Sequence, residues 1–269
     1  MKVCVLGLGE VGLSTAKYIL SRDIEVWGYD ISPNAIKNAR DSGICNATSN
    51  WDEVPDAEVY VICVSTTLRE SSPDVSSVFR ACERIAEKNY KPSLISIEST
   101  IVPGTSRRVY EEIFDKQAYL VHVPHRYWKE DPIKYGVRQV RVIGAINKES
   151  LRRGLKFYKE CLDIPLHIAP SVEVAEMSKI AENAYRYVQI AFAEELRIIC
   201  EELKLDFEEV RRACNTKWNI EILEARDGIK GHCLPKDVRY LISLTSFKSI
   251  CERAVDVDSF YRKWIARNE

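Results

Sequence analysis

The chain has 269 residues, 46% of them hydrophobic, which is long enough for two domains with packed cores. Its formal net charge of -1 gives no basis for a surface that binds nucleic acid or an anionic membrane. No basic leader opens the chain, and no apolar run approaches the roughly 20 residues that span a bilayer. We therefore expect a cytoplasmic protein with no nucleic-acid or membrane partner.

The number and spacing of the cysteines argue against a disulfide-rich protein and against a zinc site. The chain has 9 cysteines, and no two of them form a Cys-x-x-Cys pair. An odd number of scattered cysteines is not typical of a disulfide framework or of a zinc site. We expect no metal centre.

The first part of the chain alternates between two hydrophobic periods. Residues 2–6 read as a short apolar strand, and residues 10–22 carry the 3.6-residue spacing of an amphipathic helix. This alternation predicts an α/β domain over residues 1–168, built as a Rossmann-like, doubly wound parallel sheet. Further strands are expected at 24–29, 58–64, 93–97, 119–123, 140–143 and 165–168, with further helices at 74–88, 104–116 and 148–160.

The second part is helical throughout. Ser171 is a candidate N-cap, and an unbroken helical pattern follows it. We expect an all-helical domain over residues 169–269 with a long helix at 171–203. Such a helix exceeds what a small domain can bury, which favours a two-fold homodimer through it. Shorter helices are expected near 206–214, 235–244 and 248–266.

A glycine-rich turn joins the first strand to the first helix. Residues 7–12 read Gly-Leu-Gly-Glu-Val-Gly and fit the G-x-G-x-x-G fingerprint in its required context. Gly7 permits the tight turn, Gly9 lets the backbone approach a pyrophosphate, and Gly12 allows close helix packing. The amides of Glu10 and Val11 open the helix that would face the phosphates. This segment predicts a dinucleotide site.

The second strand ends at an acidic residue. Asp30 follows Gly12 by 18 positions, about where a carboxylate accepts hydrogen bonds from the adenosine ribose. The same charge repels a 2′-phosphate. The sequence therefore favours NAD over NADP as the cofactor.

Two threonines follow predicted strands. Thr66 and Thr100 stand at the carboxyl edge, where open α/β sheets bind their ligands. Both are candidate binding residues, although loop hydroxyls also cap helices. For Thr105 capping is the favoured role.

Two polar residues on the long helix share a face. Lys179 and Asn183 are four residues apart, so their side chains project one turn from each other. An ammonium and an amide that grip one oxygen would stabilise developing negative charge. The alternative is a solvated lysine and asparagine on an exposed helix edge.

Cys233 lies in the segment Gly-His-Cys-Leu-Pro-Lys-Asp at 231–237. Pro235 suits the first position of a helix, which would place Cys233 in a loop at its N-terminus. Backbone amides and the helix dipole favour a thiolate there. Asp237 would lie one turn from the thiol and orient it or a water. The alternative is that Cys233 is a small buried hydrophobe.

Taken in order, these segments resemble the UDP-glucose/GDP-mannose dehydrogenase family. The resemblance covers nearly the whole chain, at residues 7–12, 64–67, 98–105, 176–196 and 231–237. It implies a nucleotide-sugar 6-dehydrogenase that oxidises a hydroxymethyl group to a carboxylate with two NAD in succession, as in polysaccharide biosynthesis. The Gly231-His232-Cys233 sequence is more similar to members that act on UDP-N-acetylhexosamines than to glucose-specific ones.

The resemblance also implies residue roles. Cys233 would be the nucleophile that forms a thiohemiacetal and then a thioester. Lys179 and Asn183 would stabilise the oxyanions, while Thr100 and Asp237 would position water or move protons. Substrate contacts would come from the following residues: Arg126, Lys179, Asn183, Lys230 and Gly231.

The chain departs from the family pattern in three places. His125 replaces a glutamate that assists thioester hydrolysis, and a histidine can also act as a base. The glycine-rich approach to the cysteine is altered at 225–230, where Lys230 either grips phosphate or blocks the sugar site. The sequence ends at Glu269, where the family continues into a nucleotide-binding domain. A separate UDP-binding chain, a smaller substrate or lost catalysis would each account for this.

Two other functions fit the same residues. A 3-hydroxyacid dehydrogenase would use the helix lysine and asparagine for a single hydride transfer and would not need the thiol. A non-catalytic NAD-binding or assembly subunit would keep the fold without turnover.

Overall fold

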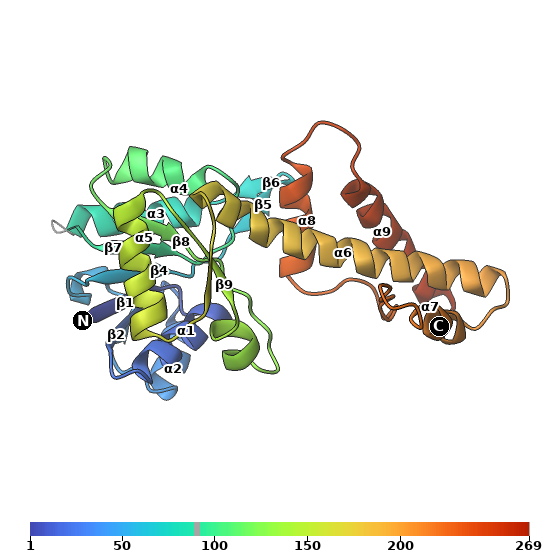
Figure 1. Cartoon of the computed structure of the whole chain (residues 1–269). Coiled ribbons are helices and arrows are strands. Elements are labelled where there is room, and N and C mark those ends of the chain that lie inside the picture. The colour runs from blue at the N-terminus through green and yellow to red at the C-terminus, as the bar shows by residue number, and fades with distance from the viewer. Residues whose placement is uncertain (89–91, 269) are drawn as a thin grey trace. The chain divides into compact units, whose positions relative to one another are not determined.

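The computed structural model describes residues 1–88 and 92–268. The chain forms two compact units (Figure 1). The sheet unit comprises Met1–Thr67 and Asp74–Lys179, and the helical unit comprises Leu68–Pro73 and the chain from Ile180 onward.

The sheet unit is built on parallel strands whose ends are in register. Leu6 pairs with Ile62, and Ile62 pairs with Ile97, so the carboxyl ends of three neighbouring strands share one edge. Within the described residues the strand order is β10-β9-β8-β7-β4-β1-β2-β3. The bounds are β1 (Lys2–Leu6), β2 (Glu25–Tyr29), β3 (Ala47–Thr48), β4 (Val59–Ile62), β7 (Leu94–Ile97), β8 (Tyr119–His122), β9 (Arg141–Ala145) and β10 (Leu166–Ile168).

Two strands, β9 and β10, depart from the expected parallel arrangement. β9 runs antiparallel to β8, with Val121 opposite Ala145, whereas β10 runs parallel to β9. The connection from β8 to β9 contains the π-helical turn η3 (Ile133–Val137) and no long crossover helix. Antiparallel neighbours need no crossover, because the chain can return from the edge at which it left the sheet.

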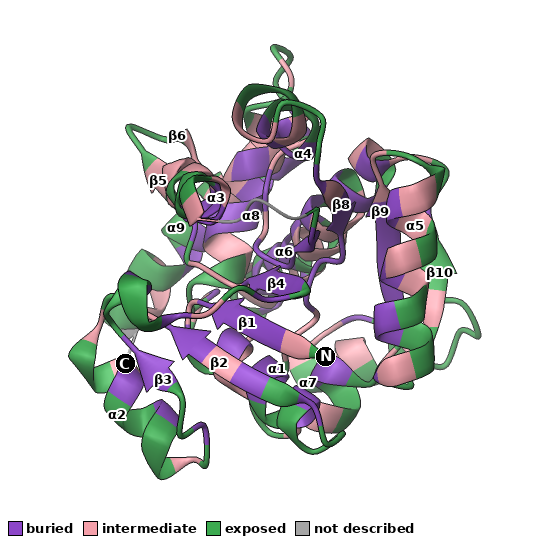
Figure 2. Ribbon diagram, turned by 90° about the vertical axis from the view of Figure 1, so that its left-hand side faces the viewer, coloured by how far each residue is buried: buried purple, intermediate pink, exposed green. Residues whose placement is uncertain are grey.

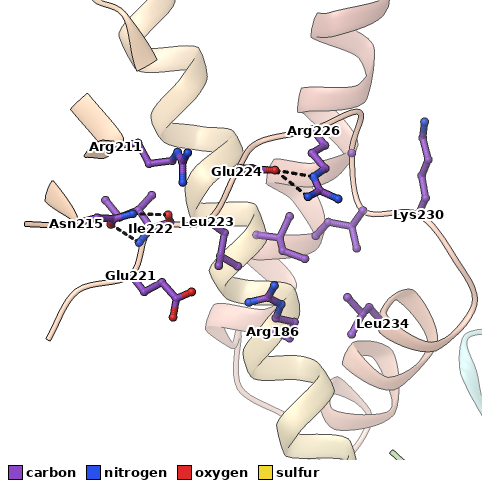
Figure 3. Close-up of a pocket in the computed structure, with 13 residues that line it drawn as sticks. Arg186, Arg211, Asn215, Glu221, Ile222, Leu223, Glu224, Arg226, Lys230 and Leu234 are labelled. Atoms are coloured by element: carbon purple, nitrogen blue, oxygen red, sulfur yellow. Dashed lines mark hydrogen bonds and ion pairs between the residues drawn. The ribbon is translucent and has the colours of Figure 1, made fainter. Parts of the chain in front are cut away.

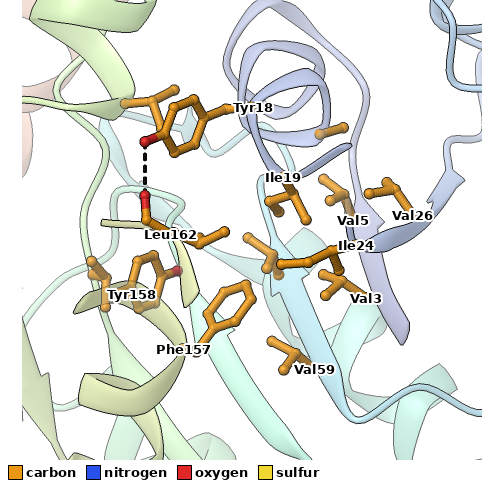
Figure 4. Close-up of a cluster of buried hydrophobic side chains, with 14 of the residues drawn as sticks. Val3, Val5, Tyr18, Ile19, Ile24, Val26, Val59, Phe157, Tyr158 and Leu162 are labelled. Atoms are coloured by element: carbon orange, nitrogen blue, oxygen red, sulfur yellow. Dashed lines mark hydrogen bonds between the residues drawn. The ribbon is translucent and has the colours of Figure 1, made fainter. Parts of the chain in front are cut away.

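Helices cover both faces of this sheet, as alternating side chains of β1 require. Val3 and Val5 enter one buried cluster, and Cys4 and Leu6 enter the other. Figure 4 shows the first cluster, where the Tyr18 hydroxyl also donates a 2.7 Å hydrogen bond to the Leu162 carbonyl. The first face carries α1 (Glu10–Leu20), α2 (Pro33–Asp41), α5 (Lys148–Leu155) and η4 (Lys156–Cys161), and the second carries η1 (Trp51–Glu53), α3 (Ser76–Lys88), α4 (Thr105–Arg108) and η2 (Val109–Ile113). Between them, the strands β1, β4, β7 and β8 are almost wholly buried (Figure 2).

The helical unit packs around the long helix α6 (Val172–Glu202). Its core includes Ala184 and Tyr187 of α6, Val238 of α8 (Cys233–Ile242) and Ala254 of α9 (Ile250–Asn268). None of the helices in the described ranges is both long enough and apolar enough to cross a membrane. The other elements are β5 (Thr67–Arg69), β6 (Ser72–Asp74) and α7 (Phe207–Cys214).

The two units divide inside α6 rather than at the 168/169 boundary expected from the sequence. The first turns of α6 belong to the sheet unit because they pack onto it closely. The Glu176 carboxylate accepts hydrogen bonds of 2.6 and 2.7 Å from the amides of Gly104 and Ser106. A Cβ atom on Gly144 would lie 2.7 Å from the Ala175 methyl group. The sequence pattern therefore changes from strands to helices before the point at which the structure divides into two compact units.

Candidate active site

The glycine-rich turn stands at the carboxyl edge of the sheet. Gly7 has φ +89, and a Cβ there would lie 2.6 Å from the Cys63 carbonyl oxygen. A Cβ on Gly12 would lie 1.8 Å from the Gly7 oxygen, so both positions need glycine for the backbone to close. A Cβ on Gly9, in contrast, would meet nothing within 4 Å. Gly9 is thus open to the approach of a ligand rather than constrained by the fold.

The neighbouring groups fit a dinucleotide. Gly9 is the N-cap of α1, so the amides of Glu10 and Val11 open the helix without intrahelical acceptors. The Asp30 carboxylate accepts from the Leu8 amide at 2.6 Å and from the Ser32 amide at 2.8 Å. These bonds fix its orientation and leave lone pairs for further donors such as ribose hydroxyls. NAD would therefore find its phosphate and ribose partners at this edge.

The two predicted threonines meet at the same edge. The Thr66 hydroxyl donates a 2.9 Å hydrogen bond to the Thr100 carbonyl oxygen. Thr66 is buried, whereas Thr100 is half-buried. The bond joins the loop after β4 to the loop after β7. The capping role expected for Thr105 is wrong: Gly104 is the N-cap of the helix that Thr105 opens, and the Thr105 hydroxyl donates to the Val102 carbonyl at 2.7 Å.

His125 follows β8 and lies buried with 4% exposure. Among the described residues, neither ring nitrogen has a hydrogen-bond partner. Burial lowers the pKa of His125 well below its ordinary value, and the positive charges of Arg141 and Lys179 lower it further. The imidazole is therefore neutral at physiological pH. Next to it, Arg126 donates a hydrogen bond to the Val140 carbonyl.

A buried ionic network that the sequence analysis missed lies in the same unit. Arg141 and Glu98 are 0% and 2% exposed and form an ion pair at 3.0 Å. Tyr158 donates to Glu98 at 2.6 Å. Glu98 immediately precedes the Ser99-Thr100 pair, so the network fixes the loop that carries Thr100. The signal for it in the sequence was a charged residue directly after one apolar strand pattern and another within a second.

In the helical unit, Asn183, Lys236 and Asp237 form one polar cluster. The Asn183 amide donates to one oxygen of the Asp237 carboxylate, and the Lys236 ammonium pairs with the other. Lys236 and Asp237 are both buried, with 6% and 0% exposure. The cluster brings together two predicted residues and one, Lys236, to which no role was assigned.

Cys233 is the first residue of α8 and is exposed. This exposure removes the alternative that it packs as a small core hydrophobe. α8 begins at Cys233 rather than at Pro235, which occupies the first turn instead. Amides of a first turn have no intrahelical acceptor, so a proline there forfeits no helical hydrogen bond. Asp237 follows Cys233 by one turn, on the same helix face.

The approach to the cysteine is a loop that other helices hold in place. Ile229 donates its amide to Asp258 at 2.8 Å, while Gly231 has φ +88, a conformation that favours glycine. Lys230 is exposed and lies 3.3 Å from Asp227. The predicted residues thus fall into two groups, listed by unit: Gly7, Gly9, Glu10, Val11, Gly12, Asp30, Thr66, Thr100, His125, Arg126 and Lys179 in the sheet unit, and Asn183, Lys230, Gly231, Cys233 and Asp237 in the helical unit.

Comparison with known proteins identifies both units. Residues 34–162 match the NAD binding domain of the UDP-glucose/GDP-mannose dehydrogenase family, and residues 173–257 match the central domain of that family. A UDP-N-acetyl-D-mannosamine dehydrogenase of Methanococcus maripaludis is 32% identical over 91% of this chain. The chain spans 62% of the length of that relative.

Solved structures agree with the sequence comparison. The UDP-D-ManNAc dehydrogenase of Pyrococcus horikoshii superimposes with a TM-score of 0.91 at 27% identity, over 99% of this chain and 70% of the other. The UDP-N-acetyl-mannosamine dehydrogenase Cap5O of Staphylococcus aureus gives a TM-score of 0.83 at 25% identity, over 98% and 69%. The chain therefore belongs to the UDP-glucose/GDP-mannose dehydrogenase family.

Proposed function

We propose that this protein is an NAD-dependent dehydrogenase that oxidises the 6-hydroxymethyl group of a nucleotide sugar to a carboxylate. The observation that carries the proposal is the exposed thiol of Cys233 at the start of α8, one turn from the Asn183-Asp237 pair. A single oxidation of an alcohol does not need a nucleophile. A second oxidation to the acid level does, because the aldehyde must first become a species that can lose another hydride.

The substrate class follows from the relatives and the cysteine segment. Relatives from Methanococcus maripaludis and Pyrococcus horikoshii carry the name UDP-N-acetyl-D-mannosamine dehydrogenase. The Gly231-His232-Cys233 sequence agrees with members that act on UDP-N-acetylhexosamines. We therefore infer a UDP-N-acetylhexosamine substrate in preference to UDP-glucose.

The proposed chemistry uses two oxidations at one carbon. When bound, NAD accepts one hydride in each of them. Between them the Cys233 thiolate adds to the aldehyde carbon, which forms a carbon–sulfur bond and an oxyanion. Loss of the second hydride leaves a thioester. Water then attacks the thioester, the carbon–sulfur bond breaks, and the carboxylate and the free thiol are released.

The polar groups stabilise charge and move protons in this scheme. We assign to Lys179 and Asn183 the stabilisation of the successive oxyanions. The Asp237 carboxylate holds the Asn183 amide in place, so one amide hydrogen is directed away from it toward the substrate. Thr100 positions water. His125, which is neutral because burial lowers its pKa, takes the proton of the attacking water.

We also propose that two copies associate through the exposed face of α6. Tyr185, Phe192 and Ile199 recur every seven residues on this helix and are 67%, 53% and 44% exposed. Apolar side chains at this spacing form one stripe along a helix. Large exposed apolar stripes mark protein–protein contacts, and a two-fold axis would bury the stripe against itself.

The test of the proposed function is turnover on a panel of nucleotide sugars. NADH absorbance and the sugar product would be followed with UDP-N-acetylmannosamine, UDP-N-acetylglucosamine, UDP-glucose and GDP-mannose. We expect a sugar acid from a UDP-N-acetylhexosamine. Tight NAD binding without turnover on any of these would instead indicate a non-catalytic subunit, and a keto product would indicate a single-oxidation enzyme. The panel would be repeated with the products of neighbouring genes, in case a separate chain supplies a UDP-binding domain.

A further inference from the structure

Arg141 of β9 bonds to the ends of two other strands of the sheet unit. The side chain is 0% exposed, and its guanidinium pairs with the Glu98 carboxylate at 3.0 Å. It also donates a hydrogen bond to the Val123 carbonyl. Glu98 follows β7 and precedes Thr100 by two residues. Val123 follows β8 and precedes His125 by the same interval. One side chain therefore supports both loops that carry groups assigned to the attack of water.

Glu98 is held in place by further donors. Tyr158 donates to the carboxylate oxygen that Arg141 contacts, at 2.6 Å. Thr15 donates to the other oxygen at 3.3 Å. The His125 amide donates to the Glu98 main-chain carbonyl at 3.3 Å. The loop after β8 is thus tied to the loop after β7 twice, once through the backbone and once through the guanidinium.

Stability alone does not explain a buried ion pair at this place. Taking two charges out of water is unfavourable, and apolar residues of similar volume often stabilise a core equally well. What a guanidinium supplies is geometry, because its donors form a planar, rigid fork that can hold two acceptors in fixed positions. A lysine would supply the same charge as a single point. The charge and the fork of Arg141 can therefore be separated by substitution.

The His125 imidazole has no hydrogen bond of its own to orient it. It is 4% exposed, and neither ring nitrogen has a partner in the part of the chain that the structure describes. A Cβ atom on Gly136 would lie 3.4 Å from the Cε1 atom of the ring, so the ring packs against η3. Burial lowers the pKa of His125, and the positive charges of Arg141 and Lys179 lower it further. The position of the ring thus depends on the backbone that carries it.

We propose that Arg141 is a positioning residue for hydrolysis of the Cys233 thioester. In this step water adds to the thioester carbon, the carbon–sulfur bond breaks, and the carboxylate and the thiol are released with one proton left on His125. Thr100 and His125 must lie at a fixed separation to hold and deprotonate the same water, and a displacement of about 1 Å can slow a reaction by about 100-fold. The inference rests on the proposed function and adds to it a residue that acts through two loops rather than on the substrate.

The thiol is supported separately, by bonds inside the helical unit. Figure 3 shows part of this support, in which the Asn215 side chain accepts from the Ile222 amide at 2.7 Å and donates to the Ile222 carbonyl at 3.0 Å. Four residues before Cys233, the Ile229 amide donates to a buried carboxylate of α9 at 2.8 Å. Arg141 takes part in none of these bonds. Its substitution should therefore leave the reactivity of the thiol unchanged.

Rapid-mixing measurement of NADH, with intact-mass analysis of the full chain, tests the proposal. The enzyme would be mixed with NAD and the UDP-N-acetylhexosamine that the wild type turns over, and the first two NADH for each site would be separated from steady turnover. In Arg141→Met we expect the first two NADH at the wild-type rate, a steady rate lowered by about 100-fold, and enzyme that carries the sugar acyl group on Cys233. Without substrate, iodoacetamide should alkylate Cys233 at the wild-type rate.

Arg141→Lys keeps the charge and removes the fork. Its hydrolysis should be as slow as that of Arg141→Met, but the pKa of His125 should stay as low as in the wild type. In Arg141→Met this pKa should rise toward its ordinary value, because one of the two positive charges that lower it is lost. NMR titration of the labelled imidazole measures the pKa without turnover. Because the lysine keeps Glu98 paired, Arg141→Lys also provides the kinetic test if Arg141→Met does not fold.

Arg138→Met is the matched control. Arg138 is exposed, precedes Arg141 by three residues and pairs with Asp163 at 3.8 Å, so its loss should leave every one of these measurements unchanged. A wild-type steady rate in both Arg141 variants would overturn the proposal, as would an equal slowing of the first two NADH and of steady turnover. A wild type that turns over while these variants match it would refute this role alone. A wild type that forms no NADH would refute the dehydrogenase function together with it.

Discussion

The side-chain amide of Asn183 donates a hydrogen bond to the carboxylate of Asp237, and so links α6 to the helix that begins at Cys233. Asp237 also receives the buried ammonium of Lys236. The carboxylate thus has two tasks: it orients an amide that we assign to oxyanion stabilisation, and it neutralises a charge that has little access to water. These tasks can be separated by mutation.

Asp237→Ala should lower the free energy of unfolding of the helical unit by about 3–5 kcal/mol, because it removes the buried carboxylate that forms an ion pair with the buried Lys236 ammonium. Urea denaturation would measure this change. Adding Lys236→Met should recover most of the loss. The control is Asp256→Ala, which breaks an ion pair with Arg253 that is 66% exposed on the aspartate side and should cost no more than about 1 kcal/mol. A loss of that small size in Asp237→Ala would show that Lys236 is not held by Asp237.

Two glycine-to-alanine substitutions in the glycine-rich turn should have different effects. Gly9→Ala should leave thermal stability unchanged, because its Cβ meets nothing within 4 Å, but weaken NAD binding by about tenfold or more by obstructing the pyrophosphate. Gly12→Ala should unfold at lower temperature, because its Cβ would lie 1.8 Å from the Gly7 oxygen. Fluorescence titration with NAD and thermal unfolding would measure the two effects. Wild-type NAD affinity in Gly9→Ala would contradict a cofactor at this turn.

Glu194 should make the helical unit less stable as the pH rises. It is 0% exposed, and neither carboxylate oxygen has a hydrogen-bond partner among the described residues. Burial, with a smaller contribution from Asp258, raises its pKa to about 8. A raised pKa means that the folded state holds the Glu194 proton more tightly than the unfolded state does. The contribution of the protonated carboxyl to the stability of the folded state is therefore complete below the unfolded pKa of about 4.3 and is lost as the pH rises through about 8.

The Glu194→Gln variant should therefore be more stable than the wild type at pH 8. In the wild type, the free energy of unfolding should fall by up to about 1.4 kcal/mol per pH unit between the two pKa values, and the variant should lack this fall. Urea denaturation at a series of pH values would measure the slope. The neighbouring and exposed Glu195 provides the control, since Glu195→Gln should keep the wild-type dependence. An unchanged slope in Glu194→Gln would mean that Glu194 ionises in the folded protein as it does in water.

Phe192→Glu should convert a dimer into a monomer. Phe192 is the middle residue of the exposed stripe on α6, and a charge there would be buried at a two-fold contact. Sedimentation velocity at micromolar concentration would report the change. Phe247→Glu carries the same substitution at a residue that is 69% exposed and lies outside α6, and it should leave the mass unchanged. A wild-type chain that sediments as a monomer would refute association through this helix.

Most of the fold could be predicted because its main elements have strong periodicity. The strands from β1 to β10 that are buried on both faces appear as continuous apolar runs, and α6 appears as one long helical pattern. α2 was not predicted, although Ser32 caps it and Pro33 opens it. The direction of β9 could not be predicted either, since strand orientation depends on how the connection from β8 packs.

The candidate site was only partly accessible from the sequence. Its motif residues, such as Gly9, Asp30 and Cys233, were found because local spacing determines what they can do. The Lys236 pairing was missed because a lysine next to an aspartate usually lies in solvent, and only the packing of α8 buries both.

The ratio of NADH formed to nucleotide sugar consumed tests the central claim most directly, measured with the wild type and with Cys233→Ser on a UDP-N-acetylhexosamine. We predict two NADH and one sugar acid for each sugar with the wild type, and no sugar acid with Cys233→Ser, because the aldehyde could not become a thioester. One NADH for each sugar with a keto product, or a sugar acid formed at the wild-type rate by Cys233→Ser, would contradict a thiol-dependent double oxidation.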